Sequence, residues 1–368
     1  MDKIKIAFVG DVFPGGVLVN QEIICDEQVM DVLMSADLRV ATLECALGPG
    51  ETDGYSFDEE KMARPDWRNI IWAPDKCIKR LKELHIDVVT IANNHIFDLG
   101  EKGLKNTIRL LDENGIKHCG AGINLEEASK PAVVEIKGRT IAFLGYMVYF
   151  TGWRAPHPAS EKSSGINIFE LDSAVSEVSR LKRQYDYLFL LPHWGDEYSY
   201  WPVPVDINYS KKLIKAGANG IMGSHTHQVQ PTVLFAKAPV CFSLGNFVFP
   251  DFFLGTNRAA CYPEPNHIPS IPATYSYERH PSSTMLRVWP QKNRLGLLHF
   301  LSLSENSLQN RRYLLRSNED NVIEFFHNKY LLLMLNTLSM AIKYTPYRIW
   351  FKYRFFINKI IDRIIHIS

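Results

Sequence analysis

The sequence predicts an α/β fold, and three observations support this prediction. Six short apolar runs end on Gly or on a polar side chain, as buried parallel strands do. Apolar residues recur at helical spacing between runs, as Val175, Val178 and Leu181 do in the segment 172–184. The string PAVVEIKGRTIAFLGY has a Lys-Gly turn at its centre and predicts a β-hairpin. Strands that alternate with helices in this way favour an α/β sandwich.

The expected elements follow one another along the chain. The first two strands are the runs IAFVG and VATL, which are separated by about 30 residues. The segment 74–118 then predicts a helix, a strand and a second helix, at about 75–84, 87–92 and 101–114. The helix at 172–184 precedes the strand YLFLLPHW, and a helix at 206–217 precedes the run GANGIMG.

Length and composition are those of a globular enzyme with a large core. The chain has 368 residues, 46% of them hydrophobic, and a net charge of +1, so we predict no nucleic-acid partner. We expect one domain over residues 1–310 and a helical, basic and aromatic extension over residues 321–368. The first strand follows the amino terminus at once and leaves no room for a leader peptide, which predicts a cytoplasmic location. The six cysteines show no CxxC pairing, and free structural thiols are expected.

Side chains that bind metals stand at the ends of the predicted strands. Because open α/β sheets bind ligands beyond the carboxyl ends of their strands, we expect these residues to meet at one rim of one sheet. Imidazole, carboxylate and amide donors together suit zinc, manganese or iron better than calcium or magnesium, so we predict one or two divalent transition metals. Glu44 is the expected bridge between two cations. The candidate ligands are Asp11, Glu44, Asn94, His193, His225 and His227, with Asn246 at the end of a further run.

Each of these residues also has a simpler structural explanation. Asp11 fits a helix N-cap or a turn, Asn94 fits a turn that tolerates positive φ, and His193 fits a hydrogen-bonded core histidine. Caps and turns do not explain why three histidines recur at strand ends together with two acids. Glu44 directly follows an apolar strand, where a carboxylate is costly to bury without a partner or a metal. The joint pattern therefore favours a metal site.

Six strings, in this order, resemble the CapA family of capsule and poly-γ-glutamate synthesis proteins, which has a calcineurin-like metallophosphoesterase fold. They are GDVFPGG, ATLECAL, IANNHIFDLG, LPHWGDEY, GANGIMGSHTHQVQP and SLGNFVF. The resemblance covers about residues 4–250, with a looser continuation to about 303. A single short motif is weak evidence, whereas six in the order of the family are strong evidence. The resemblance implies a metallophosphoesterase-like αββα sandwich, followed here by a C-terminal helical extension.

The resemblance also implies a role for each matching residue. His95 would be a general acid that does not bind metal, and Asp98, one helical turn later, would orient its imidazole. One departure concerns Phe13, because typical metallophosphoesterases have a histidine at this position. One metal would therefore have one protein ligand fewer and would bind more weakly. The implied ligands are Asp11, Glu44 and His227 for this metal, with Asn94, His193 and His225 completing the pair of sites.

The activity implied by the resemblance is that of a metal-dependent phosphoesterase-type hydrolase in capsule, poly-γ-glutamate or exopolysaccharide biosynthesis. Its substrate would be an anionic polymer or a phosphoester, attacked by an activated water while His95 protonates the leaving oxygen. The alternative is a non-hydrolytic, metal-binding component of polymer assembly or export, which the absence of a histidine at Phe13 favours. Amide-bond chemistry on a glutamate polymer is a third possibility that follows from the family name alone.

Two further segments have a predicted role. Arg64 and Arg68, in the aromatic segment 48–73, fit the binding of an anionic substrate group, although a solvated loop explains them equally well. Residues 343–368 hold six basic residues and one acidic residue among many aromatic residues and isoleucines. A helix of this composition favours peripheral contact with the inner face of a membrane, and its alternative is a terminal helix packed on the domain.

Overall fold

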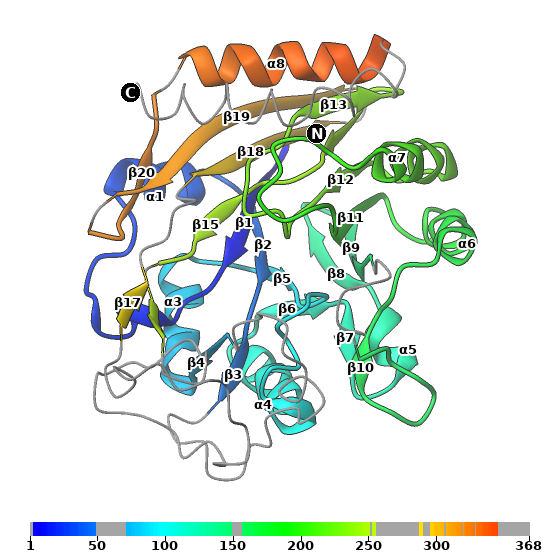
Figure 1. The fold of residues 1–368 in the computed structure, drawn as a ribbon. Helices are drawn as coiled ribbons and strands as arrows, with labels where there is room; N and C mark the ends of the chain where they lie inside the picture. Colours follow the sequence, from blue (N-terminus) through cyan, green and yellow to red (C-terminus); the bar gives the residue numbers. More distant parts are fainter. Residues whose placement is uncertain are drawn as a thin grey trace, which may run out of the picture.

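The structure is a computed structural model that describes residues 3–48, 71–148, 157–250, 252–254, 287–289, 295–304, 307–318, 320–327 and 329–344. Within these residues, two large β-sheets pack against each other and helices cover their outer faces (Figure 1). The strand ends that carry the candidate ligands lie where the two sheets approach each other.

The first sheet has eight strands and is mixed. Its centre consists of parallel strands. Strands of this kind are buried on both faces, which is why runs such as IAFVG and VATL are apolar throughout. Antiparallel strands extend it on one side. The strands are β20 (Ile323–Phe325), β19 (Ser307–Ser317), β18 (Leu295–Ser304), β1 (Ile4–Val12), β2 (Leu38–Leu43), β5 (Val88–Thr90) and β6 (Lys117–Cys119) in that order, with β15 (Asn246–Val248) paired to β1.

The second sheet has six strands, of which the inner four are parallel. The predicted hairpin forms one edge, where β8 and β9 pair in antiparallel fashion. In order, the strands are β13 (Thr232–Phe235), β14 (Ala238–Cys241), β12 (Gly220–Met222), β11 (Tyr187–His193), β9 (Arg139–Met147) and β8 (Ala132–Ile136). Short two-stranded pairs join β3 (Ala46–Gly48) to β4 (Trp72–Pro74), β7 (Ala121–Gly122) to β10 (Gly165–Ile166), and β16 (Phe252–Leu254) to β17 (Arg287–Trp289).

Aromatic side chains fill the space between the two sheets. Phe8 of the first sheet lies 5.3 Å from Phe189 and 6.2 Å from Phe143 of the second, measured between ring centroids. All three residues are buried. Each fully buried Phe contributes about 1.5–3 kcal/mol through the apolar surface it removes from water. These contacts fix the position of the first sheet relative to the second.

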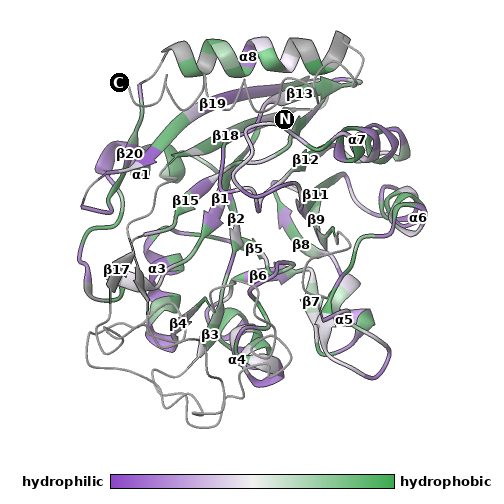
Figure 2. Cartoon of the chain, viewed as in Figure 1, coloured by the Kyte–Doolittle hydropathy of each residue, from purple (hydrophilic) through white to green (hydrophobic). Residues whose placement is uncertain are grey.

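Helices with one apolar face cover the outer surfaces. Leu33 of α1, Leu81 of α3 and Leu104 of α4 belong to the core on the outer face of the first sheet. Val178 of α6 and Leu213 of α7 are buried against the second sheet. In Figure 2 the helices α4, α6 and α7 carry both hydrophilic and hydrophobic residues, as helices with one buried face do. The helices are η1 (Gly16–Asn20), α1 (Glu27–Met34), η2 (Asp75–Cys77), α3 (Ile78–Glu83), α4 (Gly100–Glu113), α5 (Leu125–Ser129), α6 (Leu171–Leu181), α7 (Pro204–Ala216) and α8 (Lys329–Tyr344).

These four layers confirm the predicted αββα sandwich. The helices expected at 75–84, 101–114, 172–184 and 206–217 are confirmed to within a few residues, and the expected strand at 87–92 is the shorter β5. Gly115, with φ of +69°, follows α4 at the point where the sequence predicts its end.

The last described helix, α8, packs across the edge of the sandwich near β13 (Figure 1). Its buried residues Leu331, Leu335, Leu338 and Ile342 recur at helical spacing and join the core of the second sheet. The first sheet continues past residue 310 through β19 and β20. The division of the chain into residues 1–310 and 321–368 stays a prediction. No helix in the described part of the chain is long and apolar enough to cross a membrane.

Candidate metal centre

The candidate ligands converge from both sheets. Asp11 lies in β1, Glu44 directly follows β2, and Asn94 lies shortly after β5. All three strands belong to the first sheet. His193 ends β11 in the second sheet, where the Ser224 N–H donates to the Pro192 carbonyl at 3.1 Å. The expectation of one rim of one sheet is wrong in this respect, because His193 ends a strand of the second sheet and His225 and His227 follow another of its strands, β12. The packing of the sheets brings the two rims together.

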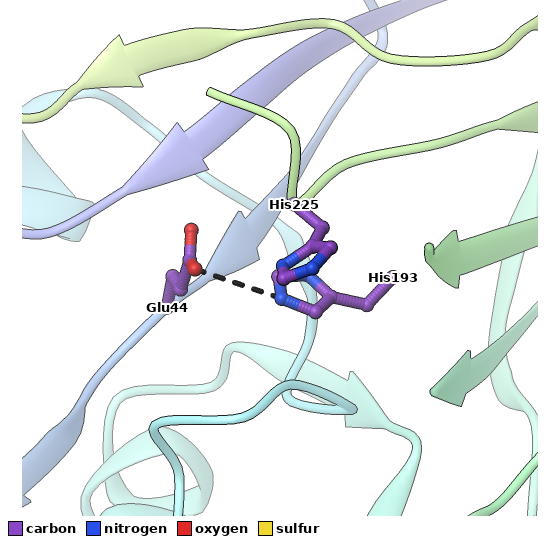
Figure 3. Close-up of side chains that lie close together, drawn as sticks. All are labelled: Glu44, His193 and His225. Carbon is purple, nitrogen blue, oxygen red and sulfur yellow. Dashed lines mark ion pairs between the residues drawn. The ribbon is translucent and has the colours of Figure 1, made fainter. Parts of the chain in front are cut away.

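One group of donor atoms consists of the Glu44 carboxylate and the His193 and His225 imidazoles, whose donor atoms lie within 4.8 Å of one another (Figure 3). The Glu44 Oε1 to His193 Nε2 distance is 3.6 Å. Asn94 Oδ1 lies 2.7 Å from the same His193 Nε2. The Ser224 hydroxyl lies 3.0 Å from the other ring nitrogen, Nδ1, and fixes the orientation of this imidazole.

A second group consists of Asp11, Glu44 and His227. Asp11 Oδ2 lies 3.8 Å from His227 Nδ1, and Glu44 Oε1 lies 3.7 Å from His227 Nε2. Asn246 Oδ1 lies 2.9 Å from His227 Nδ1 and accepts its N–H, which leaves Nε2 as the ring nitrogen that faces Glu44. Glu44 belongs to both groups, which is the position that a bridging carboxylate must occupy.

The carboxylates of the centre are buried, which is costly without a compensating charge. Asp11 and Glu44 are fully buried. Burial raises the pKa of Asp11 to about 6, although His227 and the backbone N–H of His225 act in the opposite direction. Asp11 Oδ1 accepts no hydrogen bond from the residues that the structure describes. Two buried carboxylates beside three imidazoles fit a divalent transition-metal ion, because a cation compensates the lost hydration of both acids.

His95 and Asp98 form a buried pair beside the ligands. Asp98 Oδ2 lies 2.6 Å from His95 Nδ1 and also accepts the backbone N–H of Ile71 at 2.7 Å. The carboxylate therefore favours the tautomer with its proton on Nδ1 and fixes the orientation of this imidazole. Asn93 fixes the backbone of this segment, since its side chain accepts from the His95 N–H at 2.9 Å and donates to the Leu43 carbonyl at 2.7 Å.

The backbone around the centre is strained. His225 and His227 have φ values of +96° and +55°, in a region that residues other than Gly rarely adopt. The loop after β12 holds both residues in this conformation, which turns each imidazole toward the strand ends of the first sheet. Such strain persists only where the surrounding structure fixes it, and it clusters at functional sites.

Phe13 and Phe249 form an apolar wall that meets the centre at His227. Phe13 is fully buried, and its ring centroid lies 5.5 Å from that of Phe249. Phe249 in turn contacts the His227 ring at 4.8 Å with an interplanar angle of 68°. The position that the resemblance gives to a histidine in other metallophosphoesterases therefore carries a ring packed on Phe249 and offers no donor atom.

Some of the predicted residues lie outside the described part of the chain, and some contacts of the centre were not predicted. Arg64 and Arg68 lie outside the described residues, as do residues 345–368 of the basic segment. The hydrogen bonds of Ser224 and Asn246 to the histidines could not be assigned from the sequence, because both depend on contacts between distant strands. The stacking of Tyr198 on the His227 ring was also not predicted, although Tyr198 lies in the LPHWGDEY string.

Comparisons with known proteins agree with the motif order. A model of the family described as bacterial capsule synthesis protein PGA_cap matches residues 5–251. The capsule biosynthesis protein CapA of Bacillus anthracis is 29% identical over 207 residues, which are 55% of this chain and 50% of that protein. The PGA biosynthesis protein CapA of Bacillus subtilis (strain 168) is 30% identical over 185 residues, or 50% of this chain and 48% of that protein. The chain thus spans about half the length of these curated relatives.

Among solved structures, a putative 5′-nucleotidase from Staphylococcus aureus is similar with a TM-score of 0.45 and 13% sequence identity. The similarity covers 92% of this chain and 58% of that one. At this level of similarity it carries no conclusion about activity.

Proposed function

The chain belongs to the bacterial capsule synthesis family PGA_cap, and we propose that it is a metal-dependent phosphoesterase-type hydrolase of capsule, poly-γ-glutamate or exopolysaccharide biosynthesis. Its substrate in this proposal is an anionic polymer or a phosphoester. The single observation that carries the proposal is the shared position of Glu44 in two groups of donor atoms. A buried carboxylate that serves two adjacent cation sites is typical of two-metal hydrolytic centres.

The ligands in this proposal are Asp11, Glu44, Asn94, His193, His225 and His227, and the metals are Mn, Zn or Fe. When bound, the cations supply Lewis acidity and stabilise the negative charge that develops on substrate oxygens. His95 donates a proton from Nε2 to the leaving oxygen, because Asp98 occupies Nδ1. The apolar wall of Phe13 and Phe249 excludes water from one side of the substrate.

Metal analysis combined with a panel of phosphomonoesters and phosphodiesters tests this function. We expect one or two metal ions per chain, hydrolysis of at least one ester, loss of turnover with a chelator, and recovery with manganese or zinc. Glu44→Gln should lower the metal content and abolish turnover, whereas Glu135→Gln, on the exposed side of β8, should change neither. Metal binding without hydrolysis of any ester would contradict the catalytic part of the proposal.

One observation favours a second function. Phe13 leaves the group of Asp11, Glu44 and His227 without the additional histidine of typical metallophosphoesterases, so a cation there is held by fewer protein ligands. A non-hydrolytic component of polymer assembly or export would tolerate this loss. It predicts metal-dependent binding of poly-γ-glutamate with no turnover, which the same metal-loaded protein can show by sedimentation with the polymer.

A further inference from the structure

Tyr198 stands at the rim of the candidate metal centre with an unusual backbone conformation. Its φ is +62°, in the left-handed region that residues other than Gly rarely adopt. The Tyr198 N–H donates to the Thr226 carbonyl at 2.7 Å, between the two histidines of the loop after β12. The loops that follow β11 and β12 are therefore joined at this residue, which fixes Tyr198 beside the ligands.

The side chain of Tyr198 has one covered face and one open face. Its ring stacks on the His227 imidazole, with centroids 5.9 Å apart and planes 28° from parallel. Nevertheless 58% of the residue is exposed, whereas His193 is 1% exposed and Glu44 is fully buried. Glu44 is close enough to act electrostatically on the phenol. Backbone strain of this kind clusters at functional sites, so the conformation of Tyr198 beside the candidate ligands favours contact with a molecule that approaches from solvent.

The chemistry of the rim defines what Tyr198 can bind. The phenol is protonated at neutral pH and offers one O–H donor. Glu44 and Glu197 act electrostatically on the phenol and repel anions, so a substrate anion needs the cations and a neutral donor at the entrance. A hydrogen bond to an ionised oxygen is about twice as strong as one between neutral groups.

We propose that Tyr198 binds the substrate at this centre, its phenolic O–H donating to an anionic oxygen of the substrate while its ring covers His227. The inference rests on the proposed function insofar as the substrate occupies this centre. The shared chemistry is an anionic oxygen, which comes either from a phosphoryl group or from a carboxylate of a glutamate polymer.

One variant separates substrate binding from packing, because Tyr198→Phe keeps the ring on His227 and removes only the O–H group. The matched control is Tyr187→Phe at the amino end of β11, since the centre lies at the carboxyl end of the same strand.

The experiment is calorimetric titration of the metal-loaded protein with inorganic phosphate and, separately, with γ-glutamyl-glutamate. We expect Tyr198→Phe to bind at least one probe about 10-fold more weakly, which equals about 1.4 kcal/mol, with unchanged metal content and melting temperature. Weakening with phosphate alone identifies a phosphoryl oxygen, and weakening with the dipeptide alone identifies a carboxylate. Tyr187→Phe should behave as the wild type.

Equal affinities of the wild type and Tyr198→Phe for both probes would overturn the inference, as would failure of the metal-loaded wild type to bind either probe. Binding is measured without turnover, so the result is independent of the hydrolytic proposal. If the wild type hydrolyses no ester but Tyr198→Phe weakens phosphate binding, hydrolysis is contradicted and the role of Tyr198 stands. If an ester is hydrolysed, Tyr198→Phe should raise KM in the same proportion.

Discussion

At the scale of single residues, His95 and His193 occupy different surroundings although both are buried at the centre. His193 Nε2 faces Glu44 and Asn94, whose oxygens are proposed metal ligands. His95 Nδ1 faces the carboxylate of Asp98, which also accepts a backbone N–H. This difference is the basis for proposing His193 as a metal ligand and His95 as a proton donor.

This difference leads to a prediction about two variants. His95→Ala should lower turnover by about 10²–10⁴-fold, the usual contribution of a general acid, with nearly unchanged metal content. His193→Ala should lose metal and turnover together, because it removes a donor atom. Metal analysis and steady-state kinetics on the same preparations measure both effects. Equal loss of metal in the two variants would make His95 a ligand.

At the scale of secondary-structure elements, α8 shows how one helix face stabilises the edge of the sandwich. Leu335 is buried in the core of the second sheet, whereas Leu333 on the opposite side of the helix is 64% exposed. Leu335→Ala should lower the free energy of unfolding by about 2–5 kcal/mol, because it leaves a cavity. Leu333→Ala should change it by no more than about 0.5 kcal/mol. Chemical denaturation of both variants measures the difference, and equal effects would contradict the packing of α8.

Strand β18 carries a buried histidine that makes folding sensitive to acid. His299 is fully buried, and burial, together with the charge of Arg312 opposite it on β19, lowers its pKa to about 3. In the unfolded chain the pKa of a histidine is about 6.5. Between pH 6.5 and 3 His299 is therefore protonated in the unfolded chain and neutral in the folded chain. This group therefore contributes stability above pH 6.5 that is lost as the pH falls.

We expect the protein to be about 2 kcal/mol less stable at pH 5 than at pH 8 on account of His299 alone. His299→Gln should remove this part of the pH dependence, whatever its effect on stability at pH 8. His327→Gln, at an exposed position, is the control. Denaturant unfolding at several pH values measures the slope, and identical slopes in wild type and His299→Gln would refute the assignment.

At the scale of the whole molecule, we propose that residues 343–368 contact an anionic membrane. All six candidate ligands precede residue 230, so loss of this contact should leave the metal content unchanged. Four basic residues are predicted to share one face of a helix, and each contributes about 1 kcal/mol near an anionic surface. Replacing all four by Gln should abolish sedimentation with anionic vesicles at low salt. The residues are Arg348, Lys352, Lys359 and Arg363.

The control replaces four exposed lysines elsewhere by Gln and should leave vesicle binding unchanged. Binding of the wild type should weaken as salt rises, because exposed charges are screened. A wild-type chain that stays in the supernatant with anionic vesicles at low salt would indicate a packed terminal helix or a protein-binding surface. The control residues are Lys102, Lys105, Lys182 and Lys212.

The sequence by itself determined the elements and the chemistry of the candidate site. Apolar runs and helical spacing are local properties, so the strands, the hairpin and the four helices are where their patterns predict them. The acids and histidines at strand ends are likewise visible in the order of residues. Motif order also identified the family, since six strings in sequence do not depend on tertiary structure.

Only the tertiary structure decided how these residues meet. The packing of Phe8 on Phe189 brings the rims of two sheets together, which places Glu44 in both groups of donor atoms. The hydrogen bond of Asn246 to His227 and the stacking of Tyr198 on the same imidazole join residues from separate strands and loops. Such contacts depend on the relative position of whole sheets, and the spacing of residues along one strand carries no information about it.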